Sequence, residues 1–239
     1  MRQNVFSILA LLLMTAVGAT AQTTYTVTVK EGTEDAANWS ATPNPAGEGQ
    51  SVTIKYNGTK KVKSVTAAMA ALRPLAEATP ADLGKIAGAD GIIYGTKAAA
   101  EAAGTQAVAM IAYVGSETDN AAYKHGLAIA LSDEGSMNWS TAMGKCSDKN
   151  TALPVAGASW MLPSRAQWDN MISAAGSYTA LRDGFSSVGG TNLQEEYYWS
   201  STEDDSDFAW YYNFNDGKWH NYYHARKDYS NYVRACLVF

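Results

Sequence analysis

The chain has 239 residues, of which 23 are acidic and 18 are basic, so its formal net charge at pH 7 is −5. This balance excludes a nucleic-acid partner, which would require a clustered basic surface. The only basic cluster in the sequence, Lys60–Lys63, follows a turn and is expected to be a solvated strand edge. Membrane insertion is excluded as well, because no long apolar stretch follows the N-terminal segment.

The first 21 residues have the pattern of a cleaved secretory signal. Arg2 gives a charged start, residues 5–17 are apolar, and Ala19-Thr20-Ala21 forms a small-x-small cleavage site. The apolar run is too short to span a bilayer, which disfavours the alternative of an N-terminal membrane anchor. No cysteine lies near the cleavage site to carry a lipid. We therefore expect an exported protein that is periplasmic, displayed at the cell surface or secreted.

Residues 22–67 are predicted to form a small β unit. Residues 24–29 and 51–56 alternate between apolar and polar side chains, and Asn57-Gly58 is a strong hairpin signal that leads into a strand at 61–65. The unit is too small to enclose much of a core, so we expect it to act as a spacer or to dock onto a surface-anchoring partner. The Ala-rich residues 68–78 are predicted to be a connector.

Residues 79–239 are predicted to form a second, larger unit. Short strands are expected at 91–94, 107–114 and 127–131, with one or two helical turns at 97–103. Helices are expected at 137–146 and from Ser164 onward, where Ser164 and Gln167 have the spacing of a capping box. Loops, a hairpin and a terminal strand at 233–238 follow. This order of strands, helices and strands predicts an α+β fold.

The composition changes sharply near the C-terminus. Eight of the fourteen tyrosines and two of the three histidines lie between residues 197 and 232, and no Leu, Ile, Val or Met occurs between Trp199 and Val233. Such a mixture of Tyr, Asn, Asp, Ser and His is typical of antibody binding loops, in which Tyr provides contact area and Asn and Ser provide adaptable hydrogen bonds. We interpret the stretch as a recognition surface; the alternative is an ordinary solvent-facing hairpin.

The turn Asn215-Asp216-Gly217-Lys218 predicts that this stretch folds as a β-hairpin. Alternation along the strands assigns Trp210, Tyr212, Phe214 and Trp219 to the core face. The same alternation assigns Tyr211, Asn213, Asn215, His220 and Tyr222 to an exposed face.

Several motifs resemble a known family. Trp160-Met161-Leu162-Pro163-Ser164 with Gln167-Trp168, residues 198–203, Ala209-Trp210 and residues 232–237 resemble bacterial domains of C-type lectin-like fold, and more closely the variable proteins of diversity-generating retroelements. In that family a reverse transcriptase copies a template repeat and mutates it at adenines, so that Asn codons become Tyr, Asp, Ser, His or Phe. The resemblance covers roughly residues 79–239 and implies a C-type lectin-like, ligand-binding domain that binds a protein or a glycan.

The resemblance also implies which positions are fixed and which contact ligand. Fixed positions would include Trp199, Trp210, Gly217, Trp219 and Arg234, which alternation independently assigns to the core or the turn. The expected ligand-binding residues are Asp204, Asp205, Asp207, Phe208, Tyr211, Asn213, Asn215, Asp216, His220, Asn221, Tyr222, Tyr223, His224, Asp228, Tyr229, Ser230 and Asn231.

The two cysteines raise the question of a disulfide. In an exported protein a Cys146–Cys236 bridge would close a loop of about 90 residues, which the chain-entropy account values at roughly 4 to 5 kcal/mol. Two separate buried thiols are the alternative, since neither cysteine has neighbours that suggest a nucleophile. The family resemblance favours the bridge, because its fold pairs a Cys at the end of the first helix with one in the last strand.

Metal-dependent and catalytic functions are disfavoured. The chain lacks both the Glu-Pro-Asn or Gln-Pro-Asp loop and the Trp-Asn-Asp triplet of calcium-dependent lectins, so we expect Glu203–Asp207 to be a solvated acidic loop. His220 and His224 are too far apart on a strand for a ready metal pair, and we expect no metal or cofactor. Glu195, Glu196 and Asp205 lack the spacing of a glycosidase pair.

Two other functional classes remain as alternatives to a diversified receptor. One is a fixed-specificity carbohydrate-binding or pilus-tip adhesin subunit that is held in a surface assembly by its N-terminal β unit. The other is an enzyme of the formylglycine-generating family, which shares the C-type lectin-like fold but requires active-site cysteines. The cysteine positions disfavour that enzyme.

Overall fold

The computed structural model describes residues 5–8, 24–25, 39–42, 46–47, 52–56 and 73–239. The chain divides into two compact units, residues 1–72 with 98–105 and residues 73–97 with 106–239. We call the second the C-terminal unit. Among the described residues, no helix has the length and apolar character needed to cross a membrane.

The described part of the N-terminal unit consists of short strands and one helix. Strands β1 (Val5–Ile8), β5 (Val52–Tyr56) and β3 (Trp39–Thr42) form an antiparallel sheet in that order. Strands β2 (Thr24–Tyr25) and β4 (Ala46–Gly47) pair separately, and helix α1 spans Lys97–Ala102. The predicted strand at 51–56 is therefore present as β5. The Asn57-Gly58 turn and the strand at 61–65 lie outside the described residues.

Strand β1 lies within the predicted secretory signal. Its pairing with β5 implies that cleavage after residue 21 would remove one edge strand from this sheet. The cleavage site itself lies outside the described residues, and the signal stays a prediction.

The C-terminal unit begins at Arg73, six residues before the predicted domain start at Thr79. The residues in between are built into the unit: Leu75, in a 3-10 helix at Leu75–Glu77, is buried, and the Arg73 guanidinium lies 2.6 Å from the carboxylate of Asp82. Asp82 ends a second 3-10 helix, Pro80–Asp82, where it closes a capping box with Thr79. The second half of the predicted connector thus packs as part of the C-terminal unit.

A six-stranded sheet forms the centre of this unit. Its strand order is β11 (Ser159–Met161), β16 (Cys236–Val238), β9 (Gly126–Ala130), β8 (Ala107–Val114), β6 (Ile86–Gly88) and β7 (Ile93–Tyr94). β8 and β9 are almost wholly apolar because both faces of the sheet are covered.

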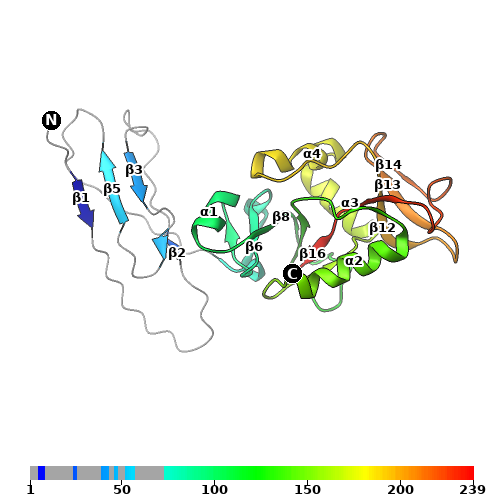
Figure 1. The fold of residues 1–239 in the computed structure, drawn as a ribbon, viewed down its shortest axis with the longest axis horizontal. Coiled ribbons are helices and arrows are strands. Elements are labelled where there is room, and N and C mark those ends of the chain that lie inside the picture. The colour runs from blue at the N-terminus through cyan, green and yellow to red at the C-terminus, as the bar shows by residue number, and fades with distance from the viewer. Residues whose placement is uncertain (1–4, 9–23, 26–38, 43–45, 48–51, 57–72) are drawn as a thin grey trace. The chain divides into compact units, whose positions relative to one another are not determined.

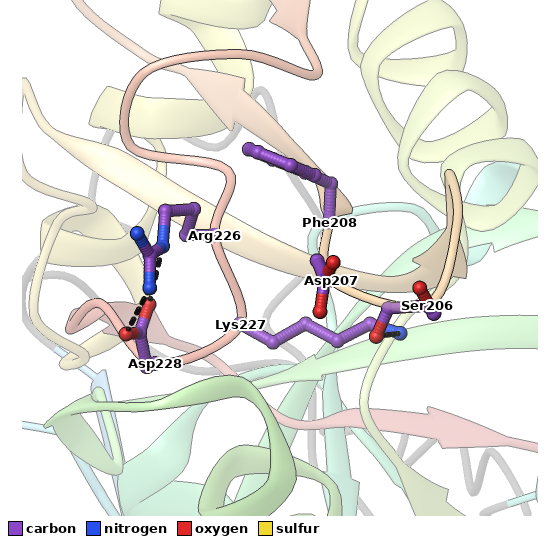
Figure 2. A pocket seen from close by; sticks show the side chains of 6 residues that line it. All are labelled: Ser206, Asp207, Phe208, Arg226, Lys227 and Asp228. Carbon is purple, nitrogen blue, oxygen red and sulfur yellow. Dashed lines mark hydrogen bonds and ion pairs between the residues drawn. The ribbon is translucent and has the colours of Figure 1, made fainter.

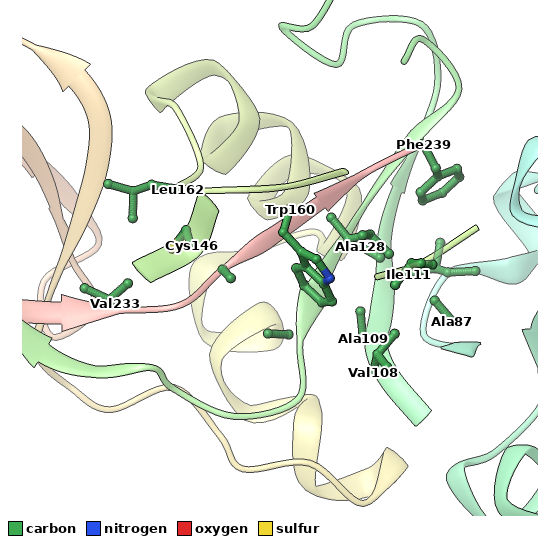
Figure 3. Close-up of a cluster of buried hydrophobic side chains, with 14 of the residues drawn as sticks. Ala87, Val108, Ala109, Ile111, Ala128, Cys146, Trp160, Leu162, Val233 and Phe239 are labelled. Carbon is green, nitrogen blue, oxygen red and sulfur yellow. The ribbon is translucent and has the colours of Figure 1, made fainter. Parts of the chain in front are cut away.

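The two faces of this sheet carry two core clusters. Along β9, Ala128 and Ala130 join the first core cluster, whereas Leu127 and Ile129 join the second, as the two-residue period of a strand requires. Helix α2 (Trp139–Ala152) contributes to the first cluster, part of which Figure 3 shows around Trp160. Helices α3 (Arg165–Ala175) and α4 (Tyr178–Asp183) contribute to the second.

The start of α3 confirms the predicted capping box. The Ser164 side chain accepts a hydrogen bond from the backbone N–H of Gln167, and the Gln167 side chain accepts one from the backbone N–H of Ser164. Trp168 and Met171 lie on the buried face of the helix, and Gly176 ends it in the left-handed conformation.

A second, five-stranded sheet has the order β10 (Gly135–Met137), β15 (Asn231–Val233), β12 (Tyr197–Glu203), β13 (Ala209–Asn213) and β14 (Lys218–His220). Strands β12, β13 and β14 lie together at one end of the C-terminal unit (Figure 1). With two sheets and flanking helices, the unit is α+β, as predicted.

The single predicted strand at 233–238 is wrong. The segment divides into β15 in the five-stranded sheet and β16 in the six-stranded sheet, and Arg234 lies where the chain crosses between them. Arg234 is fully buried, with its guanidinium 2.7 Å from a carboxylate oxygen of Asp133 and 2.9 Å from the carbonyls of Ala130 and Thr191. These partners are all distant in sequence. They hold Arg234 at the point where the backbone hydrogen bonds of β15 end and those of β16 begin.

The predicted Cys146–Cys236 disulfide is also wrong, because both cysteines are free thiols. Cys146 packs in the first core cluster and Cys236 in the second, so each fills space as a small apolar side chain. Burial raises the pKa of Cys146 to about 12 and also raises the pKa of Cys236. Both thiols are therefore protonated and unreactive near neutral pH.

Candidate binding surface

Strands β13 and β14 form the predicted hairpin, with Tyr211 opposite His220 and Asn213 opposite Lys218. The backbone N–H of Gly217 donates to the carbonyl of Asn213 over 2.8 Å. Gly217 has a φ of +71°, and a Cβ at this position would come within 2.5 Å of the Tyr178 ring. Both the turn and the close packing therefore require glycine here.

One face of the hairpin is anchored in the second core cluster, as predicted. The Tyr212 ring contacts Phe214 at 4.8 Å and Trp219 at 5.0 Å between ring centroids. The Trp219 indole N–H donates to Asp169 over 2.7 Å. Trp210 is half-buried, and the guanidinium of Arg165 lies 3.8 Å from its ring centroid. These contacts fix the hairpin to α3.

The other face is exposed only in part: Asn215 and Tyr222 are exposed, as alternation predicted. His220 is half-buried, and Tyr211 and Asn213 are buried, contrary to the prediction. Tyr211 is only 3% exposed and belongs to the first core cluster, because the chain after β14 folds over this face. Residues 221–225 lie over this face, and we call them the covering segment. The backbone N–H of Ala209 donates to the carbonyl of Ala225, which holds the covering segment in place. Burial raises the pKa of Tyr211 to about 12.

Two asparagines of the predicted site are buried as well. The Asn213 side chain accepts a hydrogen bond from the backbone N–H of Asn215, and so supports the turn. The Asn231 side chain donates to the carbonyl of His224 over 2.9 Å, which fixes the end of the covering segment. Both buried side chains therefore stabilise the loops through hydrogen bonds to the loop backbone.

A connected series of rings runs from the core to the surface. Tyr211 stacks on His220 at 5.4 Å, and His220 meets the edge of Tyr222 at 5.4 Å. A second branch leads from Tyr211 to Tyr197. The Tyr197 ring in turn stacks on the His224 ring, with 4.8 Å between the ring centroids. His224 in turn contacts Tyr223 at 5.5 Å and Tyr229 at 6.0 Å.

The outer ends of this series are the most exposed large hydrophobic side chains of residues 73–239, followed by Met143 at 38%. Tyr222 is 61% exposed, Tyr223 is 78% exposed and Tyr229 is 42% exposed. We call these three residues, with His220 and His224 beneath them, the tyrosine surface. Tyr223 has a φ of +60°, a backbone conformation that is strained for a bulky residue and that recurs at ligand-binding positions.

An acidic loop borders the tyrosine surface. The Asp205 carboxylate accepts hydrogen bonds of 2.8 Å from the backbone N–H groups of Asp207 and Phe208, so the loop between β12 and β13 is tightly turned. The Asn221 side chain donates to Asp204, which joins the loop to the covering segment.

Next to this loop is an open cleft of about 400 Å³ (Figure 2), lined by Ser206, Asp207, Phe208, Arg226, Lys227 and Asp228.

Comparison with known families identifies the chain. Residues 106–236 match the Lcl C-terminal domain. The chain belongs to the Lcl C-terminal domain family. The match spans more than half of the chain and confirms the resemblance drawn from the sequence motifs. It also includes the whole tyrosine surface and the acidic loop.

Comparisons with curated proteins and with solved structures give little further information on the chain. No curated protein matches the chain. A solved structure of a fimbrial protein from Bacteroides ovatus is similar, with a TM-score of 0.45 and 16% sequence identity. The similarity covers 66% of this chain and 48% of that protein, so the chain spans about half of the fimbrial protein's length.

The seventeen residues expected to bind ligand occupy three kinds of position in this Lcl C-terminal domain. Ten are exposed: Asp204, Asp205, Asp207, Asn215, Asp216, Tyr222, Tyr223, Asp228, Tyr229 and Ser230. Four are half-buried: Phe208, His220, Asn221 and His224. The remaining three, Tyr211, Asn213 and Asn231, are buried supports.

Several side chains of the surface were not predicted from the sequence. Tyr197 links Tyr211 to His224, and Arg226 and Lys227 line the cleft. The adjacent basic pair next to an acidic loop was the available signal for the cleft. No sequence signal pointed to Tyr197, because its role depends on ring contacts between segments distant in the chain.

Two of the three acidic residues considered for catalysis already have partners within the protein. Glu195 forms an ion pair of 2.6 Å with Arg182, and Asp205 caps its own loop. His220 contacts the carboxylate of Asp216 at 3.1 Å. Within residues 73–239, no cluster of three or more His, Cys, Asp and Glu side chains could hold a metal ion. The chemistry that this surface offers is ring contact, hydrogen bonding and charge.

Proposed function

We propose that this protein is an exported binding protein of the adhesin type, displayed at the cell surface, which holds its ligand on the tyrosine surface. The observation that carries the proposal is the exposure of Tyr222, Tyr223 and Tyr229 on a ring series anchored at Tyr211. Tyrosine gives a large contact area at low conformational-entropy cost, and a rigid support lowers the entropy lost when a ligand binds.

We also propose that the protein binds without catalysis. The buried thiols are protonated, and His220 and His224 are stacked against tyrosine rings. A recognition surface of this composition suits a protein or a glycan ligand. The N-terminal β unit would then hold the binding domain in a surface assembly by docking onto a partner.

A binding selection tests the site. The full chain is used to select ligands from a random peptide library and a glycan array, and the dissociation constant (Kd) of the tightest ligand is measured. The double variant Tyr222→Ala/Tyr223→Ala should bind that ligand at least about tenfold more weakly, with an unchanged melting temperature, because large exposed rings dominate such interfaces.

Met143→Ala is the matched control, since Met143 is 38% exposed on α2 and lies outside the tyrosine surface. It should bind the ligand as the wild type does. Ligands that bind the double variant as tightly as the wild type would place the binding site elsewhere.

For the fold and origin of the surface, we propose a C-type lectin-like domain diversified by a retroelement. The ten exposed residues among those expected to bind ligand are Asp, Tyr, Ser or Asn, that is, Asn itself or residues reached from Asn codons by mutation at adenines. Sequencing the gene and its flanks from many cells of the source population should reveal codon variation at adenine sites within residues 204–231. A template repeat and a reverse transcriptase gene should lie nearby.

An invariant region without a template repeat would reject diversification. The alternative, an adhesin subunit of fixed specificity, would then be the better account of the same tyrosine surface.

A further inference from the structure

One arginine of residues 73–239 differs from the others in what its guanidinium contacts. The other four each place a guanidinium nitrogen within 2.8 Å of a carboxylate oxygen: Arg73, Arg182, Arg226 and Arg234. Arg165 is half-buried, yet in the described part of the chain its guanidinium forms no hydrogen bond and no ion pair. The five N–H donors of this side chain are therefore unused by the described residues.

Two tryptophans of the β13–β14 hairpin hold the Arg165 guanidinium in place. The guanidinium lies 3.8 Å from the Trp210 ring centroid and 5.1 Å from the Trp219 ring centroid, distances at which a cation is attracted to an aromatic ring. Trp219 is itself fixed, because its indole N–H donates to Asp169 over 2.7 Å. The cation is thus held in position before any ligand arrives, which lowers the entropy lost on binding.

The neighbouring polar groups leave these donors free. Asp169 lies one helical turn after Arg165 on α3, but its carboxylate accepts from Trp219 and forms no ion pair with Arg165. The hydroxyl oxygen of Thr202 accepts a hydrogen bond of 3.1 Å from the backbone N–H of Arg165, and no described residue accepts the hydroxyl hydrogen of Thr202. The start of α3 therefore presents several unused donors, one group of them charged.

The chemistry of these donors selects the ligand group. A planar guanidinium can donate two parallel hydrogen bonds to a carboxylate, which makes a carboxylate the best match for free arginine donors. The Trp210 face that the guanidinium covers is closed to a stacked sugar ring. A flexible acidic side chain can still reach the edge of the guanidinium, so the geometry favours a protein ligand over a glycan at this position.

We propose that Arg165 binds the carboxylate of an aspartate or glutamate side chain on a protein partner. Trp210 and Trp219 are positioning residues that hold the cation for this contact. Because side chains alternate along a strand, these tryptophans lie on the opposite face of the hairpin from Tyr211 and His220, which support the tyrosine surface. The inference therefore adds a second binding site and goes beyond the proposed function.

Nuclear magnetic resonance with a small probe tests this site directly. The ¹⁵N-labelled full chain is titrated with N-acetyl-glutamate amide and, separately, with N-acetyl-glutamine amide, which has a similar shape but no charge. The glutamate probe should shift the side-chain Nε–H signal of Arg165 and the indole N–H signals of Trp210 and Trp219. The glutamine probe should leave all three signals in place.

Variants at Arg165 identify the recognition group. Arg165→Gln should weaken binding of the glutamate probe at least about fivefold, the effect of losing one partly exposed charge pair. Arg165→Lys keeps a cation beside the tryptophans but has no planar fork, so it should bind the probe more weakly than the wild type and more tightly than Arg165→Gln. It carries the test if Arg165→Gln disturbs the amide signals of α3 and β13.

Lys218→Gln is the matched control. Lys218 is exposed on β14 of the same hairpin, and the substitution removes the same charge at a position whose side chain lies on the other face of the strand from Trp219. This variant should bind the glutamate probe as the wild type does. An equal loss in Lys218→Gln and Arg165→Gln would mean that the probe responds to net charge alone, and would overturn the inference.

Three further results would overturn it: equal shifts with both probes, no shift of the Arg165 and tryptophan signals, or unchanged binding by both Arg165 variants. Larger shifts with methyl glucuronoside than with the glutamate probe would reject a protein side chain in favour of an acidic sugar. Failure here is separable from failure of the proposed function, because Tyr222→Ala/Tyr223→Ala should bind the glutamate probe as the wild type does.

Discussion

Neighbouring tyrosines of this protein have opposite structural roles. Tyr211 is 3% exposed and joins the first core cluster, whereas Tyr223 is 78% exposed at the outer end of the ring series. Composition marked both as recognition residues, and alternation placed Tyr211 on an outer face. Alternation describes one sheet face, and it cannot show that a later segment covers that face, as residues 221–225 do here.

The difference between these tyrosines predicts opposite effects on stability. Tyr211→Ala should lower the free energy of unfolding by about 3 kcal/mol, because it leaves a cavity among Tyr197, Trp199 and His220. Tyr223→Ala removes a mostly exposed ring and should leave the free energy of unfolding nearly unchanged. Urea denaturation followed by tryptophan fluorescence measures both values. Equal effects of the two substitutions would contradict the burial of Tyr211.

At the scale of elements, local signals predicted structure well where partners lie close in sequence. The capping box at Ser164, the hairpin turn at Gly217 and the apolar runs of β8 and β9 all appear as expected. Each of these depends on residues within a few positions of one another or on a simple period.

Elements that depend on distant partners were missed. The short strands β10 and β11 carry little pattern of their own and exist because they pair with β15 and β16. The division of the terminal strand likewise depends on Asp133, which is about a hundred residues from Arg234 in the chain. The same reason explains the cleft: its two walls, residues 206–208 and 226–228, face each other only after the covering segment has folded.

At the scale of the whole C-terminal unit, one buried ion pair connects the two sheets. Arg234 joins β15 to β16, and its guanidinium contacts Asp133 just after β9 and also lies 4.9 Å from the Phe185 ring centroid. Tyr198, on β12 of the five-stranded sheet, donates its hydroxyl hydrogen to the same carboxylate. The relative position of the two sheets, and so the position of the tyrosine surface on the central sheet, depends on this group of side chains.

Removing the cation should therefore destabilise the unit in a pH-dependent way. Arg234→Met leaves the Asp133 carboxylate buried without its partner, which should lower the free energy of unfolding by about 3–5 kcal/mol near neutral pH. Burial already raises the pKa of Asp133, and Arg234 opposes that rise. Without Arg234 this pKa rises further, so the folded variant takes up a proton at a pH where the unfolded chain does not.

The stability deficit of Arg234→Met should consequently be largest at about pH 7 and should shrink as the pH falls to about 4.5, because protonation removes the unpaired charge. Urea denaturation of both proteins at the two pH values measures the change. Arg226→Met is the matched control: its ion pair with Asp228 is exposed, at 54% and 60%, and its loss should change stability little at either pH. A deficit of Arg234→Met that is the same at both pH values would mean that lost packing, and not the buried carboxylate, accounts for the effect.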